Sequence, residues 1–378
     1  MIIRGGNVFS AVPEICGNRK RLRGKFIKKD IYIGEDKRFV SAPASGNEDI
    51  IEAEGCYVIP GLVDIHIHGC AGADFSDDDP DAPECMAAWL FSRGVTAFLP
   101  ASMTWPEERL LRIFSGACPV PDDGRHALLA GIHMEGPFIS EKKKGAQNPA
   151  YIRFPDRDEF ERLLKSAAVP VRLITLAPEL PGAMDFIDHF HRDVHISLGH
   201  SAAGYDTAKE AFDRGADHVT HLFNAMNPFL HREPGIIGAA AEREEVFVEL
   251  ICDGVHVHPA AVRAAFSLFG ADRIVLISDS MRAAGLADGE SELGGQKVYK
   301  KGRRAFLADG SIAGSVSSLT DCMKNAVRFG IPLEDAVLAA TANPARSIGL
   351  SGLVGSIREG ARGNLVILDA DLQILQVI

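Results

Sequence analysis

The segment Pro60-Gly-Leu-Val-Asp-Ile-His-Ile-His-Gly69 has the pattern of a buried β-strand that ends in two histidines. Its apolar and β-branched residues are typical of a strand covered on both faces, and the glycine after His68 ends it. Side chains two positions apart on a strand point to the same side, so the imidazoles of His66 and His68 converge. Two converging imidazoles suit a transition metal. In an α/β barrel the carboxyl ends of the strands carry the active site, so other strands are expected to add ligands there.

After residue 60, short apolar segments alternate with amphipathic stretches. Eight segments have the composition of strands: Gly61–His68, Thr96–Ala101, Leu128–Glu135, Val171–Ala177, His195–His200, His218–Phe223, Val246–Cys252 and Arg273–Ser278. Helical periodicity lies between most of them, at Glu84–Arg93, Glu107–Ala117, Glu159–Ala168, Tyr205–Arg214 and Pro259–Phe269, and is weakest in the sixth connection, Arg232–Glu242. A final helix pair is expected at Leu319–Phe329 and Leu333–Thr341. This alternation predicts an α/β fold of the (β/α)8 TIM-barrel type.

The two ends of the chain have a different pattern. Residues 1–58 and the tail from residue 355 contain strand-like pieces separated by Gly, Pro and Asn, with little helical periodicity. They predict one small β-sandwich domain, formed by residues 1–58 and 350–378, into which a metal-dependent hydrolase barrel of residues 59–349 is inserted. Residues 294–313 are expected to form a β-hairpin excursion after the eighth strand.

Composition and charge argue against nucleic acid, a membrane or a disulfide framework as features of this protein. The formal net charge of −11 disfavours nucleic acid and anionic membranes, which select basic surfaces. No apolar run approaches the roughly 20 residues of a membrane span, so a cytoplasmic protein is expected. Seven cysteines, an odd number without CxxC spacing, argue against a disulfide framework and against a thiolate zinc site.

Further candidate ligands stand at the carboxyl ends of other predicted strands. Glu135 ends the third strand, His200 ends the fifth, and His221 lies in the sixth. Imidazole and carboxylate ligands with an open position are what a hydrolytic Zn²⁺ or Fe²⁺ site needs. Asp279, at the end of the eighth strand, is placed to reach a water at such a site. His133, two residues before Glu135, is either a further ligand or a residue that supports one.

Several segments together resemble the amidohydrolase superfamily, and within it the N-acetylglucosamine-6-phosphate deacetylases. They run in the family's order across nearly the whole chain: the segment with His66 and His68, His133-Met-Glu-Gly-Pro-Phe, Leu198-Gly-His-Ser, Thr220-His-Leu-Phe-Asn-Ala-Met, Cys252-Asp-Gly-Val-His-Val-His-Pro and Ile277-Ser-Asp-Ser. The resemblance implies that Glu135, His200 and His221 bind one divalent metal and that Asp279 is the general acid and base. With His66 and His68 both present, a second metal is expected to be able to bind, giving one or two ions per chain.

The resemblance also implies a substrate site for an amino-sugar phosphate. Many superfamily members bridge two metals with a carbamylated Lys at the end of strand four, but this chain has Thr175-Leu-Ala-Pro-Glu there, so Glu135 would take the bridging role. Gln147 stands where some members have a substrate-contacting His. The expected substrate-binding residues are Ala146, Gln147, Asn224, Ala225, Arg232, His256 and Leu319. Arg232 and His256 are the candidates for the phosphate, and the family suggests that they act across the interface of a homodimer.

Two other functions stay open on the same residues. A different amide hydrolase, of the dihydroorotase or isoaspartyl-dipeptidase type, would share the histidines, since fold and metal do not select a substrate. The missing Lys and the Asn-Ala-Met segment count against it. A protein that binds a sugar phosphate without catalysis would be expected to lose Asp279, which is present.

Overall fold

A computed structural model describes residues 1–16, 19–43, 49–77 and 79–378. Eight parallel strands form the barrel, in the order β6 (Leu62–Ile67), β9 (Val95–Ser102), β11 (Ile132–Glu135), β12 (Val171–Leu176), β13 (His195–Leu198), β14 (His218–Val219), β15 (Phe247–Ile251) and β16 (Ile274–Ile277). The ring closes just beyond β16, where the Asp279 amide donates to the His66 carbonyl at 2.9 Å and the His68 amide donates to the Ser280 carbonyl at 2.9 Å. The predicted barrel is confirmed.

Some predicted strands are shorter than the sequence suggested. The third is divided into β10 (Leu128–Leu129) and β11, because Gly131 between them has φ +152° and a Cβ there would lie 2.6 Å from the Pro170 carbonyl oxygen. The sixth ends at Val219 instead of Phe223, because His221 and Phe223 have positive φ and leave the extended conformation. The early ending of the sixth strand turns His221 and Phe223 out of the strand into a loop at the carboxyl end of the barrel.

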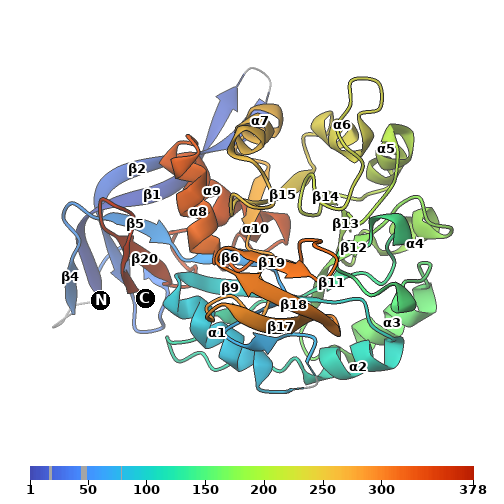
Figure 1. The fold of residues 1–378 in the computed structure, drawn as a ribbon. Coiled ribbons are helices and arrows are strands. Elements are labelled where there is room, and N and C mark those ends of the chain that lie inside the picture. The colour runs from blue at the N-terminus through green and yellow to red at the C-terminus, as the bar shows by residue number, and fades with distance from the viewer. Residues whose placement is uncertain (17–18, 44–48, 78) are drawn as a thin grey trace.

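Helices cover the outside of the barrel (Figure 1). They are α1 (Ala82–Ser92), α2 (Glu107–Gly116), α3 (Arg157–Ser166), α4 (Ala183–Phe190), α5 (Tyr205–Asp213), α6 (Gly235–Ala241), α7 (Pro259–Phe269), α8 (Leu319–Arg328), α9 (Leu333–Ala340) and α10 (Ala342–Ser347), with 3-10 turns at Glu141–Lys143 and Pro149–Tyr151. The weak sixth connection is helical as α6, while α4 and α10 were missed. None of the helices described combines the length and apolar character needed to span a bilayer.

The excursion after the eighth barrel strand is larger than predicted. It is a three-stranded antiparallel sheet of β17 (Gly289–Leu293), β18 (Gln296–Lys301) and β19 (Arg304–Leu307), where a two-stranded hairpin was expected. The loop after it returns to the barrel through the Ser315 amide, which donates to the Asp279 carbonyl at 2.7 Å. A short pair, β7 (Gly69–Cys70) and β8 (Ala73–Asp74), lies beside the same barrel end. The excursion is therefore attached to the strand end that carries Asp279.

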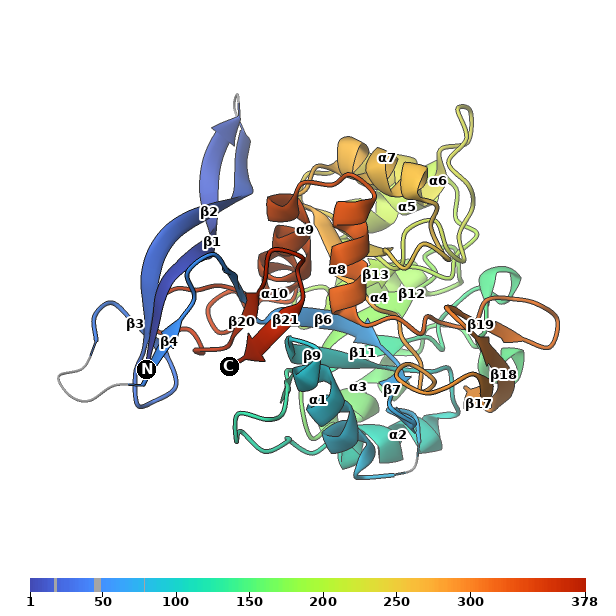
Figure 2. The same cartoon turned by 60° about the vertical axis from the view of Figure 1, so that its left-hand side comes forward.

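Both chain ends build the second, strand-rich part of the molecule, as predicted (Figure 2). Its strands are β1 (Ile2–Cys16), β2 (Arg19–Ile33), β3 (Phe39–Val40), β4 (Ile50–Glu52), β5 (Tyr57–Pro60), β20 (Leu365–Leu368) and β21 (Ile374–Val377). Among the described residues they form one mixed sheet, so a single sheet replaces the two layers expected of a sandwich. Ile3, Val8 and Val58 form its own apolar core with Leu365 and Ile367 of the tail. The domain boundaries at residues 58 and 350 stay a prediction.

One glycine fixes how the two parts join. Gly61 separates β5 of the terminal sheet from β6 of the barrel, and a Cβ at this position would lie 2.0 Å from Thr96 Oγ1. Only a residue without a side chain lets β6 approach the neighbouring strand β9 this closely. The segment that carries His66 and His68 is thus tied at one end to the terminal sheet and at its other end to the site.

Candidate metal centre and active site

The carboxylate of Glu135 is the centre of a ring of imidazoles at the carboxyl end of the barrel. Its Oε1 lies 3.2 Å from Nε2 of His66, and 3.2 Å from Nε2 of both His200 and His221. Its Oε2 lies 3.3 Å from Nε2 of His68. All five residues are buried. The structure therefore brings together every residue that the sequence predicted as a metal ligand.

Three site residues owe their direction to an unusual backbone. His200 (φ +47°), His221 (φ +29°) and Asp279 (φ +46°) each stand two residues after the end of a barrel strand, β13, β14 and β16 respectively, and lie in the left-handed region. Non-glycine residues rarely adopt this conformation, which costs of order 1–3 kcal/mol and concentrates at functional sites. The turn bends each side chain over the barrel end instead of leaving it in the alternation of the strand.

The donor set fits one or two divalent cations. Glu135, His200 and His221 form one group of ligand atoms within 4.8 Å of one another, and His66, His68 and Glu135 form a second. The Nε2 atoms of His200 and His221 lie 3.0 Å apart, which leaves room for at most one proton between them. At least one Nε2 therefore carries a lone pair, which a metal cation beside both nitrogens would accept. Imidazole and carboxylate donors without a thiolate suit Zn²⁺ or Fe²⁺.

Opposite charges dominate the titration of this group. Burial lowers the pKa of His66, but the carboxylates of Glu249, Glu135 and Asp279 outweigh it and hold that pKa well above its usual value. Burial raises the pKa of Glu135, yet the neighbouring His200 and His66 hold it well below the usual range. Burial also raises the pKa of Asp279, but His66 and His68 outweigh burial and lower it. Both carboxylates are therefore ionised, as metal binding and proton acceptance require.

Asp279 stands next to the ligands without belonging to either group. Its Oδ1 lies 3.4 Å from Nε2 of His68 and 3.8 Å from Nε2 of His66. It also lines the cavity that opens above the metal centre. A carboxylate in this position faces both the ligand ring and whatever occupies the cavity.

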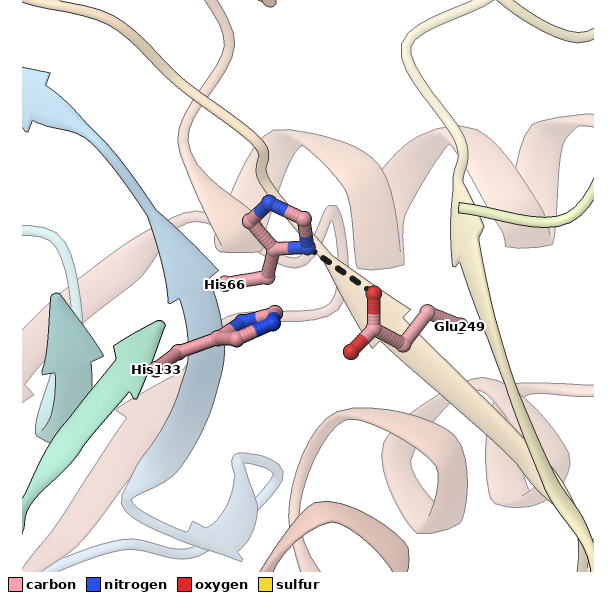
Figure 3. A group of neighbouring side chains, drawn as sticks. All are labelled: His66, His133 and Glu249. Atoms are coloured by element: carbon pink, nitrogen blue, oxygen red, sulfur yellow. Dashed lines mark hydrogen bonds and ion pairs between the residues drawn. The ribbon is translucent and has the colours of Figure 1, made fainter. Parts of the chain in front are cut away.

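His133 lies behind His66, with the two ring centroids 4.4 Å apart (Figure 3). Its Nδ1 is 3.1 Å from the Ile65 carbonyl oxygen and its Nε2 is 2.8 Å from Thr175 Oγ1. Burial, with the charge of His66, lowers its pKa well below the usual value, so the ring is neutral. Both ring nitrogens are engaged, which favours the supporting role over that of a ligand. The Thr175 hydroxyl, near the end of β12, therefore orients this ring.

A cavity of about 310 Å³ opens above the ligands. Five of the predicted substrate-binding residues line it: Ala146, Gln147, Asn224, Ala225 and His256. Two do not: Arg232 is exposed, and Leu319 is buried in α8. Leu319 therefore packs in the core, and Arg232 lies outside the cavity of its own chain. The cavity wall also includes Ser311, Ile312 and Gly314, from the loop after β19, which were not among the predicted substrate-binding residues.

Gln147 contacts a ligand as well as the cavity. Its side-chain Oε1 accepts from the Thr104 amide at 2.7 Å, which fixes the orientation of the side chain, and its Nε2 donates to Glu135 Oε2 at 2.5 Å. The amide therefore supports the central carboxylate in addition to facing the cavity.

Glu249 is a site residue that the sequence analysis missed. It lies on β15, fully buried, and its Oε2 is 2.9 Å from His66 Nδ1. The signal was a single carboxylate within the otherwise apolar strand Phe247–Ile251. A buried charge of this kind is retained only with a partner.

The comparisons with known proteins agree with this geometry. A model of the amidohydrolase family matches residues 57–377. The N-acetylglucosamine-6-phosphate deacetylase of Bacillus subtilis (strain 168) is 37% identical over 327 residues, which cover 85% of this chain and 83% of that protein. The N-acetylgalactosamine-6-phosphate deacetylase of Escherichia coli O157:H7 is 36% identical, over 87% of this chain and 88% of that one.

A solved structure extends the likeness to the whole fold. The crystal structure of N-acetyl-D-glucosamine-6-phosphate deacetylase from Mycobacterium smegmatis superposes with a TM-score of 0.87 at 35% identity, covering 100% of this chain and 98% of that one. A mutant of that enzyme has been solved in complex with N-acetyl-D-glucosamine-6-phosphate. The present chain belongs to the amidohydrolase family and, within it, to the N-acetylglucosamine-6-phosphate deacetylases.

Proposed function

We propose that this chain hydrolyses the acetamide of N-acetyl-D-glucosamine 6-phosphate to D-glucosamine 6-phosphate and acetate. The observation that carries the proposal is the position of Asp279, which lines the cavity and stands beside the ligand ring centred on Glu135. Relatives named for this reaction, at 34 to 37% identity, support the choice of substrate. The role of the enzyme would lie in amino-sugar metabolism.

The chemistry needs a water nucleophile and a proton carrier. Glu135, His200 and His221, with His66 and His68, would hold one or two divalent ions, Zn²⁺ or Fe²⁺. When bound, such an ion would supply Lewis-acid chemistry: it would polarise the acetamide carbonyl and lower the pKa of the attacking water from ~15.7 toward ~7. Asp279 accepts the proton of the attacking water and then delivers it to the amine as the C–N bond breaks. One carboxylate thus serves as general base and then as general acid.

The phosphate end of the substrate calls for local positive charge on a protein of net charge −11. Within the cavity, His256 is the candidate: burial lowers its pKa, but Asp253, whose Oδ2 is 2.7 Å from His256 Nδ1, outweighs burial and raises it. We propose that Arg232, exposed and outside its own cavity, completes this site from the partner subunit of a homodimer, as the family resemblance suggests.

Acetate release tests the proposal. The metal-loaded enzyme is incubated with N-acetylglucosamine 6-phosphate, with the unphosphorylated sugar, and with N-acetylgalactosamine 6-phosphate, the substrate class in the name of one relative. We expect the first to be hydrolysed with a kcat/KM at least ~30-fold above that of the unphosphorylated sugar, because a charge-assisted phosphate contact contributes ~2–4 kcal/mol. No acetate from the first sugar refutes the proposal, and preference for the third reassigns the hexosamine. Elemental analysis of the same sample gives the identity and number of the metals.

A further inference from the structure

The carboxylate of Glu249 lies in the middle of barrel strand β15, beneath the ligand ring. Val248 and Leu250, its neighbours in the strand, are fully buried apolar residues, and Glu249 is itself fully buried. Burying a carboxylate costs several kcal/mol unless hydrogen bonds or charges compensate it. The groups that contact the Glu249 carboxylate therefore indicate its structural role.

Those partners connect the two ligand groups. Oε2 of Glu249 lies 2.9 Å from His66 Nδ1, a member of the group His66, His68 and Glu135 (Figure 3). The same oxygen accepts from the backbone amide of His221 at 3.2 Å, a member of the other group. Its second oxygen, Oε1, is buried and has no hydrogen-bond partner among the described residues.

The four ligand imidazoles differ in what stands behind them. Nδ1 of His68 faces the Ala101 carbonyl oxygen at 3.1 Å, and Nδ1 of His200 faces the Lys143 carbonyl oxygen at 2.9 Å. Nδ1 of His221 has no hydrogen-bond partner in the described part of the chain. His66 is the one of the four whose Nδ1 faces a carboxylate. A carboxylate that accepts Nδ1–H fixes the tautomer, aims the Nε2 lone pair at the metal and makes that nitrogen a stronger donor than a neutral carbonyl does.

We infer that Glu249 is a positioning residue that sets the affinity of the second metal site, the group of His66, His68 and Glu135. Through His66 it makes that site strong enough to fill, so the centre of this chain is binuclear. Its bond to the His221 amide orients the backbone of the first site without changing the basicity of that imidazole. This inference rests on the proposed function only in taking the ligand ring as a metal centre.

The test is a titration of the metal-free enzyme with Zn²⁺ in the presence of a competing chelator, followed by calorimetry. We expect two binding steps in the unaltered protein. Glu249→Gln keeps an acceptor oxygen of the same shape but removes the charge, so the second step should weaken by about 10–100-fold while the first changes less than about threefold. Glu249→Leu removes the acceptor as well and should abolish the second step. Circular dichroism confirms that each variant is folded.

Asp64→Asn is the matched control. Asp64 is another fully buried barrel carboxylate, but its Oδ1 bonds backbone amides, Ser278 at 3.3 Å and His66 at 3.4 Å, and no imidazole. It should leave both affinities within about threefold. Any of four results would overturn the inference. The unaltered protein could bind Zn²⁺ in a single step; Glu249→Gln could leave both affinities unchanged, or weaken both equally; or Asp64→Asn could weaken the second step as much as Glu249→Gln does. Because the titration uses no sugar, an enzyme that shows the expected steps but releases no acetate would refute only the proposed function.

Discussion

Replacing Asp279 with Asn tests the proposed proton transfer at the atom that performs it. An amide can neither accept the proton of the attacking water nor return one to the leaving amine. Because Asp279 belongs to neither group of metal-ligating atoms, the variant should keep its metal. Asn has the same shape and tolerates the left-handed conformation that this position requires, φ +46°, better than Ala does, so the fold is expected to survive.

The expected loss follows from the role assigned to this carboxylate. General acid–base catalysis contributes ~10²–10⁴-fold, so kcat should fall by that factor, which corresponds to about 2.7–5.4 kcal/mol of barrier. KM should change far less, since Asp279 acts on the reacting atoms. The assay is acetate release under saturating substrate, with elemental analysis of the same preparation. A kcat within tenfold of the unaltered enzyme would refute the assignment, and a loss of metal would make Asp279 a ligand instead.

Three further predictions concern other parts of the molecule. His200→Ala should remove the ion held with Glu135 and His221 and abolish hydrolysis, which metal analysis after dialysis checks; full occupancy would contradict the assignment of that group. Arg232→Ala should raise KM for the phosphorylated sugar by ~30-fold or more and hardly affect KM for the unphosphorylated sugar, and an equal loss on both sugars would count against the phosphate role. Mixing Arg232→Ala chains with Asp279→Asn chains should restore activity in hybrid dimers, because one of the two sites then has both residues; no rescue would count against a site shared between subunits. Asp217 lies at the opposite, amino end of the barrel strands, with Nδ1 of His218 and Nδ1 of His195 each 2.6 Å from one of its carboxylate oxygens. Burial raises the pKa of Asp217, but these two histidines outweigh burial and lower that pKa below its value in the unfolded chain. The stability that this interaction contributes is present above about pH 4 and is lost as pH falls through the folded pKa of Asp217. Asp217→Asn should therefore lower the melting temperature at pH 7, and the difference in melting temperature between the variant and the unaltered protein should shrink toward pH 3. Thermal melts across that pH range check this.

The residues of the metal ring could be found from sequence because each follows a strongly apolar segment. His66 is the last but one residue of buried strand β6 and Glu135 ends buried strand β11. The carboxyl ends of parallel barrel strands meet at one face whatever the exact boundaries are. An error of a few residues in a strand end, as at His221, therefore did not move the residue to another part of the molecule. Helix α4 was missed although its buried residues Ala183, Phe186, Ile187 and Phe190 have helical spacing. The sandwich became one sheet because pairing between distant strands depends on contacts that local periodicity does not report.

Supporting residues were harder to predict for a physical reason. Glu249 reaches His66 across 183 positions of the chain, and Gln147 reaches Glu135 by a side-chain amide whose direction depends on the Thr104 backbone. Nothing in the spacing of these residues encodes such contacts. The same holds for Leu319, which family resemblance suggested as a substrate contact but which α8 buries in the core.

The sequence by itself determined the barrel, the position of the site at its carboxyl face and the chemical type of the ligands, because these follow from short-range hydrophobic pattern and residue chemistry. Only the tertiary structure decided which atoms meet. It showed that one oxygen of Glu135 serves three imidazoles, that both nitrogens of His133 are engaged, and that Arg232 lies outside its own cavity. Distances of about 3 Å between atoms far apart in the chain result from packing of the whole barrel, and no local pattern contains them.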